Sequence, residues 1–119
     1  MRRREFERLV ARALESLPVP FQSRLDNVVV IVEDWPSPEL LQDLEVDPDE
    51  TLFGYYEGTP LTEYGRDAGA ALPDRIYIYQ GAIEEVCRTK AEIIEEVRKT
   101  VLHEVGHHFG LGEAELEHL

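Results

Sequence analysis

The segment from His103 to Glu113 constrains the fold of this chain more than any other stretch of it. It reads H-E-V-G-H-H-F-G-L-G-E, with two histidines four residues apart and Glu104 between them. On an α-helix, imidazoles at this spacing lie on one face and can share a tetrahedral zinc ion, while the intervening carboxylate can act on a metal-bound water. The pattern predicts a helix with a metal site on His103 and His107. The alternative is a surface helix end on which two histidines lie by chance.

The residues before the motif predict a helix that begins near Thr89 and ends at Gly110. Thr89 is a candidate N-cap, and Glu92 follows three residues later, as in a capping box. At about 100° per residue, His103 and His107 fall nearly opposite an apolar stripe. The stripe consists of Ile94, Val97, Val101 and Val105. The core face and the metal face of this helix are therefore expected to be separate surfaces.

A catalytic zinc ion usually has three protein ligands, so a third must join the two histidines. Gly110 can end the helix in a left-handed conformation and turn the chain back toward the metal. Glu113 is the acidic residue at the right spacing, with a solvated carboxylate as the alternative. We expect His108, near the apolar stripe, to support the site through a hydrogen bond to backbone or a carboxylate, or to pack in the core, rather than to bind the metal. Phe109 is expected in the core.

The sequence resembles the minimal zincins, small bacterial metallopeptidase-like proteins with an H-E-x-x-H-x-x-G-x-x-(acid) motif. Besides the motif, the resemblance covers the basic N-terminal helix, L-D-N-V-V-V-I-V-E-D (25–34), G-Y-Y-E-G-T-P-L-T-E (54–63) and L-P-D-R-I-Y-I-Y (72–79). It implies an α+β fold (α/β-type minimal zincin), in which a small mixed sheet packs against an N-terminal helix and a C-terminal active-site helix. It also implies one Zn²⁺ ion, Glu104 as the catalytic carboxylate, and three ligands: His103, His107 and Glu113. Met1 is the only methionine, so the methionine turn of the metzincins is excluded.

The rest of the chain predicts three strands, at 27–33, 52–57 and 75–80, and two more helices. The strand at 27–33 is a continuous β-branched run and is expected to be buried. Ser37 is a candidate cap for a short helix over Leu40, Leu41 and Leu44. An N-terminal helix is predicted by apolar residues at three- and four-residue steps, namely Phe6, Leu9, Val10, Ala13, Leu14 and Leu17.

Four residues are candidates for contact with a substrate or its oxyanion: Tyr64, Arg66, Tyr77 and Tyr79. The last two alternate with isoleucines in the strand at 75–80. In larger zincins an edge strand pairs with an extended peptide, and the resemblance suggests that this strand does so too, with its tyrosines lining the groove. Core packing is the alternative. Tyr64 and Arg66 lie in a long loop, 58–73, and the alternative for them is that they are ordinary exposed loop residues.

Length and composition fit one zincin-like domain over residues 1–119, of which 43% are hydrophobic. The net charge of −13 opposes binding to nucleic acid or to an anionic membrane, and it favours a peptide or protein partner that is basic, although charge also serves solubility. The N-terminus has no apolar leader, so a cytoplasmic location is expected. Cys87, the single cysteine, excludes an internal disulfide and is expected to be a small buried residue.

These residues favour zinc-dependent hydrolysis of peptide bonds, in which Glu104 acts as general base toward a metal-activated water. The alternative is a non-catalytic, metal-containing module that binds a peptide or protein. Glu104 favours the enzyme, because a purely structural zinc ion on this helix would need only the imidazoles.

Overall fold

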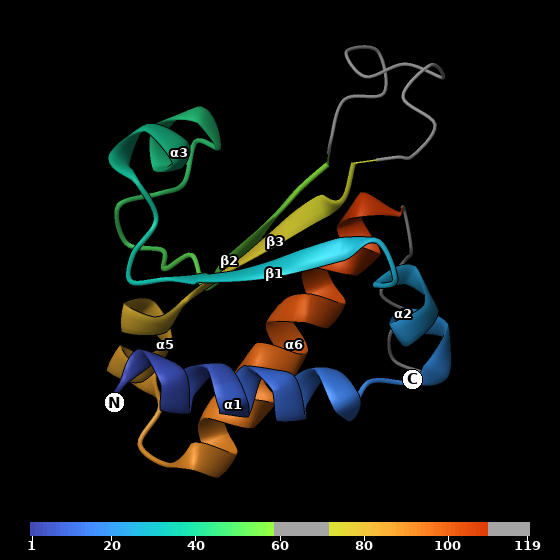
Figure 1. The fold of residues 1–119 in the computed structure, drawn as a ribbon. Coiled ribbons are helices and arrows are strands. Elements are labelled where there is room, and N and C mark those ends of the chain that lie inside the picture. The colour runs from blue at the N-terminus through green and yellow to red at the C-terminus, as the bar shows by residue number, and fades with distance from the viewer. Residues whose placement is uncertain (59–71, 110–119) are drawn as a thin grey trace.

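A three-stranded mixed sheet forms the centre of the fold (Figure 1). The computed structural model describes residues 1–58 and 72–109. In these residues β1 (Val28–Glu33), β2 (Gly54–Glu57) and β3 (Asp74–Tyr79) form a sheet in the order β1-β3-β2. β1 runs parallel to β3, and β2 runs antiparallel to it. The predicted α+β fold with a small mixed sheet is confirmed.

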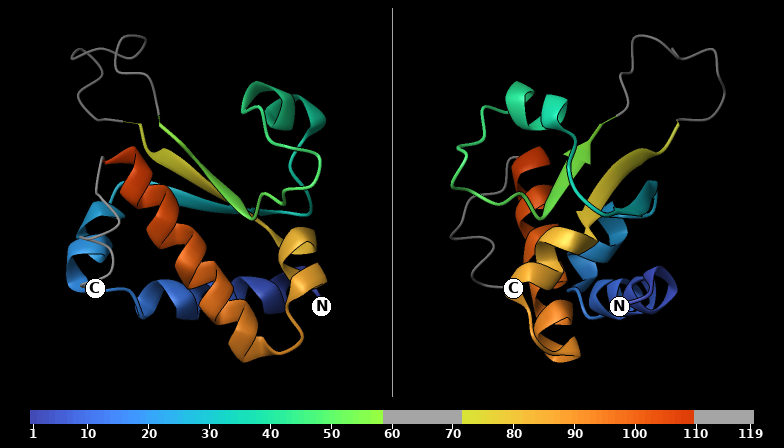
Figure 2. Two further views of the ribbon diagram at one scale, coloured as in Figure 1. Left: turned by 180° about the vertical axis from the view of Figure 1, so that it is seen from behind. Right: turned by 90° about the vertical axis from the view of Figure 1, so that its left-hand side faces the viewer.

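The two faces of the sheet are covered unequally. α1 (Arg3–Glu15) and α6 (Lys90–His108) lie together on one face, whereas α3 (Pro38–Asp43) lies on the other, as Figure 2 shows from two further sides. The remaining described helices, α2 (Val19–Arg24) and α5 (Gln80–Val86), flank these layers. None of the helices within residues 1–58 and 72–109 is long and apolar enough to cross a membrane.

The core lies where α1 and α6 meet the sheet. Its buried residues from these elements are Phe6, Leu9, Val10 and Ala13 of α1, Ile93, Val97, Val101 and Val105 of α6, and Ile76 and Ile78 of β3. The apolar stripes predicted for both helices are confirmed, although on α6 Ile93 is buried and Ile94 is only partly so. Each fully buried side chain of this kind contributes about 1.5–3 kcal/mol. The position of α6 is therefore fixed by its packed side.

Two helix starts were predicted from their caps, and both are confirmed. The hydroxyl of Thr89 accepts a hydrogen bond from the Glu92 N–H at 3.1 Å, and the Glu92 carboxylate accepts one from the Arg88 N–H at 3.1 Å. The Ser37 hydroxyl accepts one from the Leu40 N–H at 3.1 Å. These bonds satisfy N–H groups that have no partner within the first turn of a helix.

The strand order corrects two expectations. The strand at 75–80, expected at an edge, is the central strand β3, because β1 and β2 occupy both of its hydrogen-bonding sides. The strand at 27–33, expected to be buried, is the edge strand β1, and Val29 on it is 44% exposed. The β-branched run does pack Val28, Val30 and Val32 against the core, but its other face is partly open.

Candidate metal centre

α6 runs against β2 in a register that brings three pairs of residues together. Gly54 lies so close to α6 that a Cβ on it would be 2.7 Å from Thr100 Cγ2 and 2.7 Å from the Tyr77 carbonyl oxygen. Four residues further along the helix, Glu104 contacts Tyr56. Four residues beyond Glu104, His108 lies against Gly58. A Cβ on Gly58 would be 3.0 Å from Cε1 of the His108 ring.

The fit follows from the dimensions of the two elements. Four residues of helix rise about 6 Å, and two residues of strand rise about 6.7 Å. Helix positions four apart can therefore meet strand positions two apart over the length of the short strand β2. The two glycines allow the close approach at either end, and Glu104 is held at the middle of the contact.

Glu104 is held through a backbone hydrogen bond. Its Oε1 accepts the Tyr56 N–H at 2.9 Å. The Phe53 carbonyl accepts a hydrogen bond from the Tyr79 N–H, so Phe53 is a hydrogen-bonded position of the antiparallel pair. Such positions alternate along a strand, and therefore the N–H of Tyr56, three residues later, points away from β3 toward the edge of the sheet. Burial raises the pKa of the Glu104 carboxyl, while the Tyr56 N–H and nearby His103 and His107 act in the opposite direction. None of the described residues donates a hydrogen bond to Oε2 of Glu104.

His103 and His107 lie side by side on the exposed side of α6. Their ring centroids are 4.2 Å apart, with 44° between the ring planes. The predicted pairing of these two imidazoles on one face of the helix is therefore observed. Within residues 1–58 and 72–109 no group of three His, Cys, Asp or Glu side chains is arranged to hold a metal. Glu113, the expected third ligand, lies outside the described residues.

His108 turns toward the sheet rather than toward the other two histidines. Its ring stacks on the Tyr56 ring, with centroids 4.0 Å apart and 24° between planes, and its Nε2 lies 3.8 Å from Asp74 Oδ2. The Tyr56 hydroxyl donates to the same Asp74 oxygen at 2.6 Å. Burial and the Asp74 carboxylate raise the pKa of the Tyr56 phenol, which keeps it a donor. His108 thus lies beside a carboxylate, as expected of a supporting group, and is not a core residue.

Of the other five residues singled out from the sequence, the structure describes three. Tyr79 is 1% exposed, so for this residue core packing, the stated alternative to a place in the groove, is confirmed. Tyr77 is half-buried on β3. Phe109 was expected in the core but is 39% exposed. The Arg24 guanidinium lies over its ring, with the guanidinium carbon 4.6 Å from the ring centroid. Tyr64 and Arg66 lie outside the described residues.

Tyr56 and Asp74 are site residues that the sequence did not reveal. Tyr56 supplies the N–H that holds Glu104 and the ring that supports His108, and Asp74 receives its hydroxyl. One local signal was available, since Tyr56 has a glycine two residues away on either side in G-Y-Y-E-G. Glycines at that spacing in a strand mark a line along which another element approaches closely.

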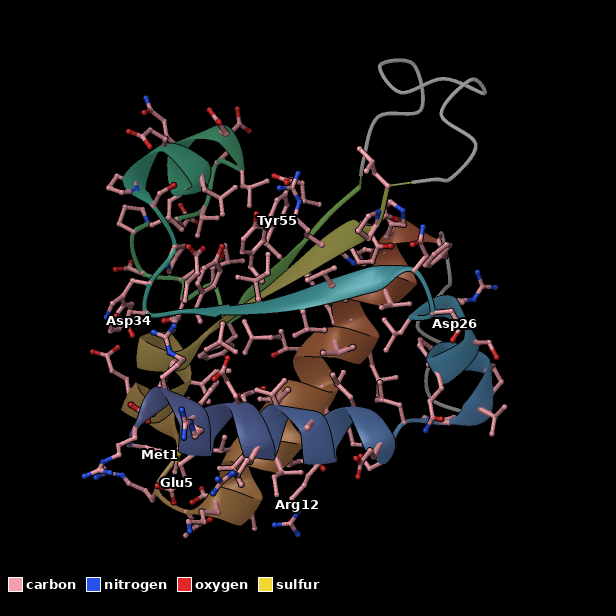
Figure 3. All side chains as sticks on the ribbon, in the orientation of Figure 1. Met1, Glu5, Arg12, Asp26, Asp34 and Tyr55 are labelled. Carbon is pink, nitrogen blue, oxygen red and sulfur yellow. The ribbon has the colours of Figure 1, made fainter. Side chains whose placement is uncertain are left out.

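Glu104 lies between two hollows at the free edge of β2, and both hollows also share Leu52. The first, here named the threonine hollow, has a volume of about 390 Å³ and is lined by Thr51, Leu52, Phe53, Gly54, Glu96, Lys99, Thr100, His103 and Glu104. The second, named the tyrosine hollow, has a volume of about 300 Å³ and is lined by Leu44, Leu52, Tyr55, Tyr56, Glu104, His107 and His108. Figure 3 shows Tyr55 on the side of the sheet toward α3. The Glu104 carboxylate therefore borders both hollows, with His103 in the wall of the first and His107 in the wall of the second.

Comparisons with known proteins identify a family and a similar structure. The family model described as zincin-like metallopeptidase matches residues 25–119. A solved structure, a conserved hypothetical protein from Thermus thermophilus, is similar to this chain with 28% sequence identity and a TM-score of 0.58, over 90% of this chain and 92% of that one. No curated protein matches the chain. The resemblance stated from the motif is confirmed, and the chain belongs to the zincin-like metallopeptidase family.

Proposed function

We propose that this protein is a zinc-dependent peptidase with Glu104 as its general base. The observation that carries the proposal is the hydrogen bond from the Tyr56 N–H to Oε1 of Glu104, on the turn of helix that also carries His103 and His107. A structural metal site would not require this carboxylate, held by a strand edge between two hollows.

In the proposed mechanism His103 and His107, with Glu113 as the expected third ligand, hold the ion. When bound, zinc would lower the pKa of water toward neutrality and polarise the scissile carbonyl. Oε1 of Glu104 stays fixed on the Tyr56 N–H, so Oε2 takes the proton of the attacking water and passes it to the leaving nitrogen.

The substrate in this proposal is an extended peptide beside β2. The resemblance suggested peptide pairing with the strand at 75–80, but β3 has no free side, so the proposal places the peptide in the two hollows that Glu104 borders. The net charge of −13 favours a peptide with basic residues. A cytoplasmic location and the absence of nucleic-acid or membrane partners stay predictions from the sequence.

Hydrolysis of a mixed peptide library by tag-free protein tests the proposal. Zinc-loaded wild type should cleave library peptides, and removal of zinc should abolish cleavage. Glu104→Gln should keep its zinc, measured by metal analysis, and lose cleavage by about 10²–10⁴-fold, because the proton acceptor is gone. Glu95→Gln, an exposed position on the same helix, is the matched control and should cleave normally.

An unchanged cleavage rate in Glu104→Gln would remove this residue from the mechanism. Full zinc loading without any cleavage by wild type would favour the alternative, a metal-containing module that binds peptides or proteins without cutting them. The hollows have volumes of about 390 and 300 Å³, which are small for ligand-binding sites, and this favours the alternative.

A further inference from the structure

The outer side of β1 is not paired with any strand of residues 1–58 and 72–109. The right-hand view of Figure 2 shows β1 at the outer side of the sheet, with no helix beyond it. Soluble proteins usually protect such an edge with charged side chains, prolines or bulges, because an unpaired edge attracts another strand. Residues 28–32 of β1 are all valine or isoleucine. This stretch of the edge therefore lacks the protective residues.

A hydrogen bond at the start of β1 shows which of its backbone groups face outward. The Asn27 carbonyl accepts the N–H of Asp74 at the start of β3 at 3.1 Å, so Asn27 faces β3. The two sides of a strand alternate from one residue to the next. The N–H and carbonyl groups of Val28, Val30 and Val32 are therefore directed away from β3, toward the outer side.

The first and the last of these outward groups are bonded within the chain. The Val28 N–H donates to the Leu25 carbonyl at 3.1 Å, and the Val32 carbonyl accepts a hydrogen bond from Arg3 Nη1 at 2.6 Å. Among the described residues, the groups between them have no hydrogen-bond partner, namely the Val28 carbonyl, the N–H and carbonyl of Val30, and the Val32 N–H. The free groups thus form a short row with an occupied group at each end.

The row is complementary to the same row in a second copy of the chain. If two β1 strands run antiparallel with Val30 opposite Val30 on a two-fold axis, each Val30 N–H meets the Val30 carbonyl of the other copy. Each Val32 N–H then meets the Val28 carbonyl of the other copy, and the occupied groups fall opposite each other just outside the ladder. A shift by two residues would place an occupied group against a free one. Only one register therefore pairs every free group.

The same register covers exposed apolar surface. Val29, which is 44% exposed, and Ile31 alternate with the residues that pack against the core, so they lie on the opposite face of the sheet. Each would be directly opposite the other residue of the second copy, and side chains so placed stabilise an antiparallel pair. At the ends of the strands Asp34 would approach Asp26 of the second copy, but the Asp34 carboxylate is already paired with Arg3.

We propose that this protein forms a two-fold dimer in which the β1 strands of two copies pair antiparallel around Val30 and join both sheets into one. The partner is a second copy because its free and occupied groups match those of β1 in a single register, which an unrelated strand has no reason to do. Glu104 contacts β2 at the other edge of the sheet, so both candidate sites stay open in the dimer. The inference can therefore fail without affecting the proposed function.

Sedimentation equilibrium of the full chain tests the dimer. At about 100 μM, wild type should sediment with twice the mass of one chain. Val30→Pro removes an N–H that has no partner among the described residues, and an edge strand tolerates proline at such a position, so the variant should fold. It deletes half of the proposed ladder bonds and should weaken the dimer at least about tenfold.

A second pair of variants serves if Val30→Pro does not fold. Val29→Lys places an ammonium group opposite Ile31 of the second copy, at a position that is exposed in the single chain, and should also weaken the dimer about tenfold. Val86→Lys makes the same change on α5, where the side chain is 50% exposed, and should leave association unchanged. Both variants alter the net charge equally.

Hydrogen exchange measures the register of the pairing. As the protein concentration rises, the N–H groups of Val30 and Val32 should exchange more slowly. The Val28 N–H is already bonded to Leu25 and should change least. Because each copy carries a net charge of −13, screening by salt should strengthen the dimer.

Several results would overturn the inference. They are a wild-type chain that stays monomeric, a dimer that neither Val30→Pro nor Val29→Lys weakens, and protection of other N–H groups in place of Val30 and Val32. A dimer that dissociates when salt is added would also contradict it, since ion pairs would then hold the copies together. Protection of Val30 and Val32 by an added unrelated peptide, in a chain that remains monomeric, would assign the edge to a foreign strand instead.

Discussion

The two sides of α6 carry different tasks. On one side Val97, Val101 and Val105 are completely buried against the sheet and α1. On the other side His103 and His107 are exposed and contact each other. The buried side supplies the free energy that fixes the helix, and the exposed side contributes little to it. The position of α6 therefore does not depend on His103 and His107, so the two sides should respond separately to substitution.

The largest effect is expected on the exposed side. His103→Ala should abolish zinc binding, measured by calorimetric titration, because one of the two imidazoles on the exposed face is lost. The unfolding free energy of the metal-free protein should stay within about 0.5 kcal/mol of wild type. His108→Ala is the matched control and should retain zinc, since this ring stacks on Tyr56 instead. Equal zinc affinity in the two variants would break the division between the histidines.

The buried side should show the reverse response. Val101→Ala removes two methyl groups from a fully buried position and should lower the unfolding free energy by about 1.5–3 kcal/mol, measured by urea denaturation. Val19→Ala makes the same change at a position that is 74% exposed, where less than about 0.5 kcal/mol is expected. Similar losses in both variants would mean that the packing of α6 does not carry the stability assigned to it.

Gly54→Ala should affect both the stability of the fold and the function of the site. A Cβ there would lie 2.7 Å from the Tyr77 carbonyl oxygen, which is backbone and cannot move aside. We expect a loss of about 1–3 kcal/mol in unfolding free energy, together with slower peptide cleavage because α6 shifts relative to Tyr56. In Gly58→Ala the nearest atom, at 3.0 Å, belongs to the His108 side chain, which can rotate, so the loss should be smaller. A larger loss in Gly58→Ala than in Gly54→Ala would contradict the register between α6 and β2.

The smallest effect concerns helix caps. Thr89→Ala removes the hydroxyl that accepts the Glu92 N–H and should lower the unfolding free energy by about 1 kcal/mol. Ser37→Ala removes an equivalent bond from α3, which has no buried residue, so this helix should open locally and global stability should fall less. Hydrogen exchange of the two helices separates local from global opening, and faster exchange in α6 than in α3 would reverse the comparison.

The parts of the fold that could be predicted from sequence are those set by neighbours along the chain. The Thr89 and Ser37 caps and the buried stripes of α1 and α6 depend on residues three to eight positions apart. α2 and α5 could not be predicted in this way, because they span 6 and 7 residues and neither has a side-chain cap. Short helices without these signals depend on tertiary contacts.

The order of the strands and the setting of Glu104 could not be predicted for a different reason. The alternation in β3 does not distinguish a central strand from an edge strand, and only its two partners reveal it as central. The bond between Tyr56 and Glu104 joins residues 48 positions apart, and local periodicity carries no information about such pairs. The pairing of His103 with His107 was predictable because one helical turn separates them, whereas the role of Tyr56 required the register of α6 on β2.

X-ray diffraction from crystals of the zinc-loaded protein, recorded at the zinc absorption edge, would locate the metal ion and identify its ligands. We predict a single anomalous peak about 2.0–2.1 Å from one ring nitrogen each of His103 and His107, with an acidic side chain as third ligand and one coordination position open toward Glu104. A peak elsewhere, or an ion whose four positions are all filled by protein atoms, would contradict the assignment of this helix face to catalysis.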